Sequence, residues 1–273
     1  AVMVFETVKA RLLVARVGRE VTLTLGNGAF ARTLDDQEYV ANMINKYGLV
    51  AIPIIDHEDC LVGIVTVDDA MLVLQDETTE DISIMAGVSP NEDSYFGTSV
   101  FQHAKNRSLW LMLLMLSATV TGEILGYYEN AMAVMPVLIT FIPMLMGTGG
   151  NCGSQSSTLV IRGLAVGEIE FKDIFRVIFK EIRIALIVGL LLSVVNGIRI
   201  YIMYDQNSML ALALGITMIA VVTMAKCIGC ILPLLAKKLG LDPAIMAAPL
   251  ITTILDTCTI LVYFNIVTAF FHI

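Results

Sequence analysis

The sequence predicts an α-helical membrane protein that crosses the bilayer five times and carries a small α/β module before its first span. Of the 273 residues, 57% are hydrophobic and only 15% are charged, and the mean hydropathy is +0.80. Globular domains carry roughly 25% charged residues, so lipid is the expected surrounding of much of this chain. Nothing in the sequence is typical of a soluble enzyme, and we expect no enzymatic activity.

Five apolar runs each exceed the ~20 residues that a helix needs to cross the bilayer core. They are Ser108–Tyr128, Ala131–Val160, Ile184–Tyr204, Leu210–Leu235 and Ala244–Phe271. Basic residues precede the first run, separate the second from the third, and follow the fourth. Because Lys and Arg accumulate on the cytoplasmic side, we expect a multi-pass plasma-membrane protein with a cytosolic N-terminus and an external C-terminus.

The acidic charge is concentrated before the first span. Residues 35–93 contain 14 carboxylates and the single basic residue Lys46. Such a surface repels nucleic acid and attracts cations, although a merely solvated acidic face is the simpler alternative. The chain begins at Ala1 rather than Met and has no signal-peptide pattern, which predicts a fragment whose soluble part is cytosolic.

Residues 31–78 have the pattern of a helix, two strands and a second helix. The first helix is expected over Glu38–Tyr47 and the strands over Ala51–Ile55 and Leu61–Val67. The second helix is expected over Asp68–Leu74, behind Thr66.

The remaining segments complete the predicted organisation. Residues 1–30 stay unassigned, although Val21–Leu25 alternates like a strand and a turn at Gly26–Gly28 follows. Residues 79–107 are expected to form an acidic linker and a connecting helix, and residues 108–273 the five-helix membrane domain.

Three charged residues fall deep inside the predicted spans: Glu123, Lys226 and Asp256. A charge at mid-bilayer costs about 2.5–3.5 kcal/mol on insertion scales, so each is a functional candidate. We expect the opposite charges of Glu123 and Lys226 to pair within the membrane. Asp256 is different, because Thr252 and Thr253 lie one helical turn before it and present further oxygen atoms.

The second span carries a strip of small and polar residues from Gly147 to Thr158. Its glycines, Gly150 among them, would permit an unwound turn whose carbonyls line a cavity, or else the close packing of two helices. Asn151 and Gln155 are spaced four residues apart and are harder to explain by packing. Carboxylate, amide, hydroxyl and carbonyl oxygens are hard ligands that suit Mg²⁺ or Ca²⁺.

Residues 33–74 resemble one CBS module, through Ala51-Ile52-Pro53-Ile54-Ile55-Asp56, Leu61-Val62-Gly63-Ile64-Val65-Thr66 and Asp68-Asp69. CBS modules normally pair, and the second copy would be degenerate within residues 1–30 or lie upstream of Ala1. Such modules often bind adenine nucleotides, so the resemblance implies ATP as a ligand of this module.

The membrane part resembles the MgtE family of magnesium channels and transporters. The likeness rests on Gly149-Gly150-Asn151-Cys152-Gly153-Ser154-Gln155, on Arg162-Gly163-Leu164-Ala165, and on Asp242-Pro243-Ala244 with Pro249-Leu250-Ile251-Thr252-Thr253-Ile254-Leu255-Asp256. It implies a homodimer in lipid, with an ion path at the two-fold axis lined by spans two and five. The family's N-terminal helical domain is absent from this sequence, and residues 1–30 do not resemble a normal first CBS module.

The resemblance also assigns roles to individual residues. It makes Asp256 the pore carboxylate, places Asn151 and Gln155 in the pore motif, and makes the cytosolic carboxylates a Mg²⁺ sensor that closes the pore. The sensor residues are Asp68, Asp69, Asp76, Glu77, Glu80 and Asp81. Two rival functions share the same features: transport of another divalent cation such as Mn²⁺ or Co²⁺, and a membrane-anchored nucleotide sensor that transports nothing.

Overall fold

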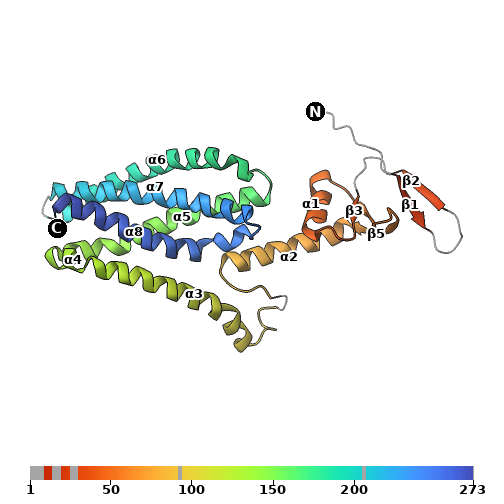
Figure 1. The fold of residues 1–273 in the computed structure, drawn as a ribbon, viewed down its shortest axis with the longest axis horizontal. Coiled ribbons are helices and arrows are strands. Elements are labelled where there is room, and N and C mark those ends of the chain that lie inside the picture. The colour runs from red at the N-terminus through yellow and green to blue at the C-terminus, as the bar shows by residue number, and fades with distance from the viewer. Residues whose placement is uncertain (1–8, 14–19, 25–29, 92–93, 205–206, 273) are drawn as a thin grey trace. The chain divides into compact units, whose positions relative to one another are not determined.

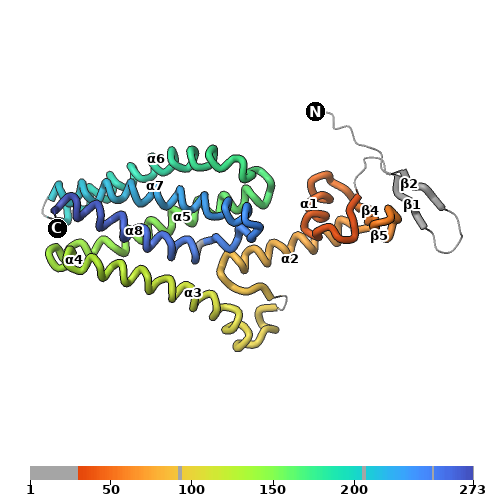
Figure 2. The backbone as a smooth tube through the Cα atoms, in the orientation of Figure 1, coloured from red at the N-terminus to blue at the C-terminus, as the bar shows by residue number. Residues whose placement is uncertain are grey.

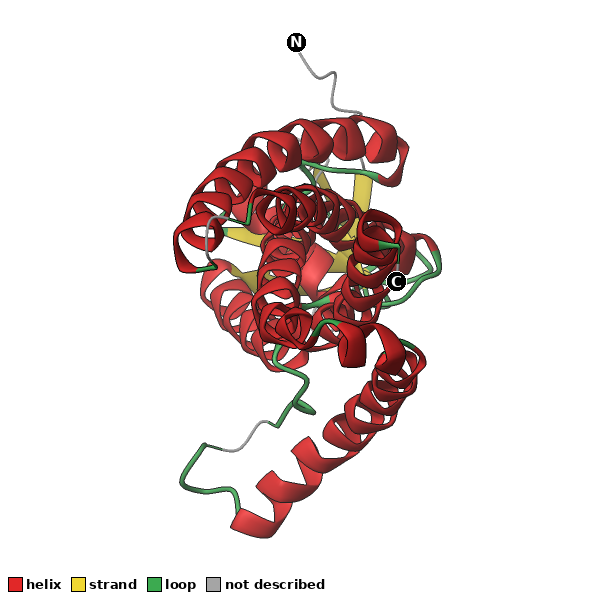
Figure 3. Cartoon of the chain, turned by 90° about the vertical axis from the view of Figure 1, so that its left-hand side faces the viewer, coloured by secondary structure: helices red, strands yellow, loops and turns green. Residues whose placement is uncertain are grey.

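The computed structural model describes residues 9–13, 20–24, 30–91, 94–204 and 207–272. The chain divides into two compact units, residues 1–81 and residues 82–273. We refer to them as the N-terminal unit and the helical unit, and each is described by itself (Figure 1). Among the residues described, strands occur only in the N-terminal unit. Figure 3 colours them yellow and the helices red.

The N-terminal unit begins with a two-stranded antiparallel sheet. Strand β1 (Lys9–Leu13) pairs with β2 (Glu20–Thr24), with Arg11 opposite Thr22. The alternation that predicted a strand near Val21 is therefore confirmed to within a residue. The turn predicted at Gly26–Gly28 lies outside the described residues.

The second sheet has the order β3-β4-β5, with β3 (Ala31–Arg32) parallel to β4 (Ala51–Ile55) and β4 antiparallel to β5 (Leu61–Thr66). Helix α1 (Gln37–Tyr47) connects β3 to β4. The Asp36 side chain caps its N-terminus by accepting from the amide of Glu38, and Gly48 ends it with a φ of 61°.

The core of this sheet and its two helices is small. It is formed by the buried residues Ala31, Val40, Ala41, Ile44, Ile52 and Ala70. The predicted order of helix, strand, strand and helix is confirmed by α1, β4, β5 and α2.

Helix α2 (Val67–Met85) is longer than the sequence predicted. The expected helix ended at Leu74 and an acidic linker followed, but the helix continues through the acidic residues to Met85. No Gly or Pro interrupts this stretch, and the hydroxyls of Thr78 and Thr79 donate to the carbonyls of Leu74 and Gln75 one turn earlier. The first residues assigned to the linker, up to Met85, are thus part of a helix.

The turn that follows α2 packs on the first long helix of the helical unit. Gly87 has a φ of +69°, and a Cβ there would collide with the indole ring of Trp110. The amide of Ser89 also donates to the carbonyl of Asn106 at 3.0 Å. Only glycine fits at position 87, both for its backbone conformation and for its contact with Trp110.

Helix α3 (Val100–Tyr127) unites two segments that the sequence analysis separated. The connecting segment before Arg107 and the first predicted span form one continuous helix, which starts where Ser99 accepts from the amide of Gln102. This correction follows from the absence of any breaker between Val100 and Gly122, so the chain has no reason to leave the helix at the membrane boundary.

The second predicted span, Ala131–Val160, is split in the structure. Residues 129–141 form the short helix α4 (Glu129–Val134) and the 3-10 helix η1 (Pro136–Phe141), and the long helix α5 (Ile142–Ala165) begins only afterwards. Pro136 and Pro143 explain the break, because proline lacks the amide hydrogen that would continue a helix and is favoured in a first turn.

The rest of the helical unit consists of α6 (Ile174–Met203), α7 (Ser208–Lys238) and α8 (Ala248–Phe271), with the 3-10 turns η2 (Phe171–Asp173) and η3 (Pro243–Met246) before α6 and α8. Helix α7 packs against α5, α6 and α8, whereas α3 packs mainly along α8 (Figure 2). Among the residues that the structure describes, three helical segments are long and apolar enough to cross a membrane: Val100–Tyr127, Ser208–Lys238 and Pro243–Phe271.

Glycines allow the long helices to approach closely. A Cβ at Gly229 of α7 would collide with the carbonyl oxygen of Gly153 on α5. A Cβ at Gly189 of α6 would lie 3.2 Å from the Cα of Ile219 on α7. Helix α7 is therefore in backbone contact with α5 at one position and with α6 at another.

The first prediction concerns this contact. Gly229→Ala is expected to push α7 away from α5 and lower the melting temperature in detergent, because overpacking a tight interface costs about 1–3 kcal/mol. Gly197→Ala on α6 is the matched control, since a Cβ there meets no atom within 4 Å. The control should melt at the wild-type temperature or above it. Equal melting temperatures for the two variants would contradict the close approach of α5 and α7.

Candidate functional site

Helix α5 exposes one polar face along its whole length. Gly147, Asn151, Gln155, Thr158 and Arg162 are all exposed, and their spacing of three or four residues puts them on one side of the helix. The opposite side is buried against α7 and α8. An amphipathic helix of this kind, lying among apolar helices, must turn its polar side toward water or toward another protein surface.

The glycines of α5 lie mainly on its buried side. A Cβ at Gly150 would be 3.1 Å from Thr252 Cγ2, and one at Gly149 would be 2.8 Å from Thr259 Oγ1. The unwound turn expected here is absent, because α5 is helical without interruption from Ile142 to Ala165. These glycines instead allow the helices to pack closely, and Gly150 faces α8.

Asp256 lies on α8 between the sides that contact α5 and α3. Thr252, one turn earlier, faces Gly150 of α5, while the hydroxyl of Thr257 lies 2.6 Å from that of Thr121 on α3. Asp256 is half-buried, and among the described residues its carboxylate has no hydrogen bond or ion pair. An ionised carboxylate in such a place needs water, a cation or both.

Thr252 and Thr253 are partly occupied with their own helix. Each hydroxyl donates to the carbonyl of Pro249 at 3.0 Å, which leaves the oxygen lone pairs available as acceptors. The contacts of Gly149 and Gly150 with Thr259 and Thr252 bracket Asp256 on the facing helix.

Of the oxygen groups that the sequence singled out, Thr252, Thr253 and Asp256 share α8, whereas Asn151 and Gln155 lie on the side of α5 that faces away from α8. Within the described part of one chain, no group of three or more His, Cys, Asp or Glu side chains could hold a metal ion by itself. A cation at Asp256 would meet one carboxylate per chain, with neutral oxygens around it. Such a site suits a hard cation that keeps part of its water.

The predicted pair of Glu123 and Lys226 is wrong. The Lys226 ammonium lies 3.7 Å from the carboxylate of Glu181 and donates to Ser156 Oγ at 3.2 Å. Glu123 is exposed on α3 instead. Glu181 was not predictable from the sequence because it sits between Lys180 and Arg183, in a stretch expected to be a charged connection. In the structure α6 already begins at Ile174 and carries Glu181 into the bundle.

The six carboxylates expected to sense Mg²⁺ all lie on α2, but in two groups. Asp68 and Asp69 occupy the first turn of the helix, where its dipole favours negative charge. Asp76, Glu77, Glu80 and Asp81 lie about 10 Å further along, at a rise of ~1.5 Å per residue. The second group has the spacing of two i, i+4 pairs, and Glu77 accepts from the side chain of Gln37 at 3.0 Å.

Asp69 accepts two hydrogen bonds from Thr66, the last residue of strand β5. One of its carboxylate oxygens accepts from the hydroxyl of Thr66 at 2.6 Å and from the Thr66 amide at 3.1 Å. The hydrogen bond from the Thr66 hydroxyl is the main reason why the pKa of Asp69 is lower than usual. Asp69 is thus held ionised and in a fixed orientation at neutral pH.

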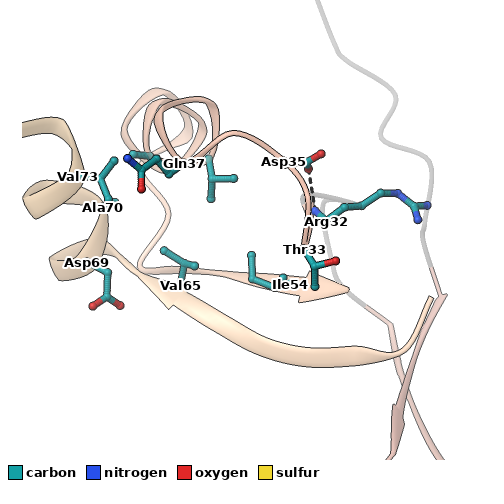
Figure 4. Close-up of a pocket in the computed structure, with 11 residues that line it drawn as sticks. Arg32, Thr33, Asp35, Gln37, Ile54, Val65, Asp69, Ala70 and Val73 are labelled. Carbon is teal, nitrogen blue, oxygen red and sulfur yellow. Dashed lines mark hydrogen bonds between the residues drawn. The ribbon is translucent and has the colours of Figure 1, made fainter. Parts of the chain in front are cut away.

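A cavity of about 300 Å³ lies beside Asp69 within the N-terminal unit (Figure 4). Apolar side chains such as Ile54, Val65 and Val73 form its walls, and polar groups follow strand β3. The polar lining residues are Arg32, Thr33, Asp35, Gln37 and Asp69. Only Asp69 was singled out from the sequence, because the others are ordinary residues of a strand end and a helix start. A mostly apolar cavity with a few polar groups at its edge is the common form of a small-molecule site.

Part of the chain matches the model of a known protein family. The family model MgtE, described as a divalent cation transporter, matches residues 142–266, which run from the start of α5 into the last turns of α8. The matched segment therefore contains both the polar face of α5 and Asp256.

Three curated relatives share the name magnesium transporter MgtE. The protein of Thermus thermophilus is 37% identical over 237 residues, 87% of this chain and 52% of the relative. That of Bacillus subtilis is 38% identical over 242 residues, 89% and 53% of the two chains. That of Enterococcus faecalis is 36% identical over 239 residues, 86% and 51%. The chain spans about half the length of these relatives, and on this likeness it belongs to the MgtE family.

Proposed function

We propose that this chain forms the membrane path, and part of the cytosolic regulatory region, of a transporter that lets Mg²⁺ flow down its electrochemical gradient into the cytosol. The observation that carries this proposal is the Asp256 carboxylate on α8, half-buried and without a protein partner among the described residues. The names of the relatives, magnesium transporters, support Mg²⁺ as the ion.

The functional form is a homodimer in the plasma membrane, with five spans per chain, a cytosolic N-terminus and an external C-terminus. The exposed side chains of α5 support this arrangement, because Asn151, Gln155 and Thr158 would lack hydrogen-bond partners in lipid. A second copy related by a two-fold axis would enclose these groups in a water-filled path. It would also place two Asp256 carboxylates around one ion.

Mg²⁺ suits this path because it loses its water reluctantly. It usually binds through one or two carboxylates and keeps several waters, which then bond to outer oxygens. Asp256 of each chain supplies the charge, and Thr252, Thr253, Asn151 and Gln155 supply neutral oxygens. Mn²⁺ and Co²⁺ are the rival ions, since the family model is described only as a divalent cation transporter. Competition for uptake distinguishes them.

The acidic residues of α2 serve as the regulatory site. When cytosolic Mg²⁺ is scarce, the carboxylates of Asp76, Glu77, Glu80 and Asp81 repel those of the second subunit and favour an open path. When it is plentiful, bound Mg²⁺ neutralises them and the path closes. Asp68 and Asp69, in the first turn, contribute to the same sensor.

The N-terminal unit adds a CBS-like module, residues 31–78, that binds ATP in the cavity beside Asp69. The apolar slot and its polar edge support an adenosine ligand. This same cavity is the observation that favours the second candidate function, a membrane-anchored nucleotide sensor without transport. Cation flux through reconstituted protein decides between the two.

The second prediction tests the ion site. In liposomes loaded with a Mg²⁺ indicator, Asp256→Ala should reduce uptake to the level of protein-free vesicles, and Asp256→Asn should weaken it strongly because the charge is lost. Glu123→Gln is the matched control, since it removes a carboxylate from an exposed side of α3. Wild-type flux through well-folded Asp256→Ala would refute the site.

The third prediction tests the sensor in the natural full-length protein. Neutralising Asp76, Glu77, Glu80 and Asp81 to Asn or Gln should leave conduction intact but shift its inhibition to at least tenfold higher cytosolic Mg²⁺, because the closing ligands are lost. Glu38→Gln together with Glu58→Gln removes charge elsewhere in the N-terminal unit and should not shift it. An unchanged response of the fourfold variant would leave the cluster as a solvated acidic surface.

The fourth prediction tests the nucleotide. Isothermal titration of the purified protein with ATP should give saturable binding that Asp69→Asn weakens about tenfold. The asparagine keeps an oxygen to accept from Thr66 but loses the charge that favours ribose hydroxyls. Asp56→Asn, a similar change at the turn after β4, is the control. Affinity that is equal in both variants would place ATP elsewhere.

A further inference from the structure

A buried polar network joins three helices of the helical unit. Ser156 on α5 donates its hydroxyl to Glu181 on α6 at 2.6 Å, and Lys226 on α7 donates to the same hydroxyl at 3.2 Å. The side chains are almost inaccessible, with residue exposures of 0% for Ser156, 5% for Lys226 and 7% for Glu181. One hydroxyl thus stands between two opposite charges and uses both its donor and its acceptor capacity.

Stability alone does not explain such a network. Replacing a buried ion pair by apolar residues of similar volume is often neutral or stabilising, because taking two charges out of water is costly. What a fully bonded polar network adds is a unique arrangement of the elements that carry it. Here the arrangement is defined by Ser156, because its hydroxyl reaches Glu181 and Lys226 only in a narrow range of rotations of α5.

The contacts of α5 give a reason why its rotation needs to be fixed in this way. In the middle of α5 its closest approach to α7 and α8 is made by Gly149, Gly150 and Gly153, which have no side chains of their own, whereas Leu145 and Val160 pack in the core on either side. A surface of small residues allows close contact but specifies the rotation of a helix weakly. A single buried polar residue can supply that specificity, as it does for register in coiled coils.

A second serine on the buried side of α5 bonds to a different element. Ser157 donates to the carbonyl of Met246 at 2.7 Å, in the turn that leads into α8. The two consecutive serines therefore attach α5 to α6 and α7 in one direction and to η3 in another. Their neighbours Asn151 and Gln155 lie on the exposed side, and a rotation of α5 by one residue, about 100°, would turn that polar face away.

We propose that Ser156, Glu181 and Lys226 form a positioning network that fixes the rotation of α5 and thereby aims Asn151 and Gln155 at the ion path. The relevance of that face to ion flow rests on the proposed function. The rotation itself does not, so it can be measured without transport. The three residues touch no transported ion in this proposal and act only through α5.

The fifth prediction measures the rotation by cysteine labelling in detergent. Cys60, Cys227 and Cys258 are first replaced by alanine, because they are partly exposed, and the buried Cys152 and Cys230 are kept. Gln155→Cys should then react with a water-soluble maleimide at least tenfold faster than Val160→Cys, whose position is buried. Introducing Glu181→Met together with Lys226→Met should reduce this ratio of rates at least tenfold, with the melting temperature maintained.

Ser156→Ala provides a second test that changes the packing little and leaves both charges in place. It should also lower the ratio, whereas Gly197→Ala should not. A ratio that stays at the wild-type value in both network variants would overturn the positioning role, whatever happens to flux. A lowered ratio accompanied by normal Mg²⁺ uptake would overturn the link to the ion path. Absence of uptake by the unmodified protein would count against the proposed function and leave the labelling result standing.

Discussion

The close approach of α5 and α7 at Gly153 and Gly229 is the constraint on which the helical unit depends. Two helices whose backbones touch leave no room for side chains between them, so α5 buries glycines and serines on that side. Its larger polar residues are then confined to the opposite side. The exposed face of Asn151 and Gln155 is therefore a consequence of how tightly the helix is packed on its other side.

Polar groups in this unit fall into two kinds. Ser156, Glu181 and Lys226 satisfy one another in the interior, and Ser157 and Thr257 find partners on neighbouring elements. Asp256 has no such partner among the described residues, although its two neighbouring threonines bond to their own helix. Lys226 is paired with Glu181 inside the unit, whereas the Asp256 carboxylate stays open to water or to a cation from outside the chain.

The sequence predicted a helical membrane unit because apolar length and the scarcity of buried charge are local properties, although it misplaced the boundaries of the second span and of the acidic helix. It located Asp256 for the same reason: one carboxylate in a long apolar run is visible without knowing its neighbours. The partner of Lys226 was not predictable in this way. Glu181 lies in a stretch rich in basic residues, and only the packing of the first turns of α6 on α7 places it inside. The role of the α5 glycines was likewise ambiguous, because a carbonyl-lined turn and a packed helix need the same residues.

The contact of Gly87 with Trp110 gives the protein an optical property. Trp110 is the single tryptophan of the chain, so the entire indole emission comes from the point where the turn after α2 rests on α3. The indole nitrogen is buried and has no hydrogen-bond acceptor among the described residues. Loosening of that turn would admit water to the nitrogen and shift the emission to longer wavelength. The junction of the acidic helix with the first membrane helix thus carries its own fluorophore, without any label.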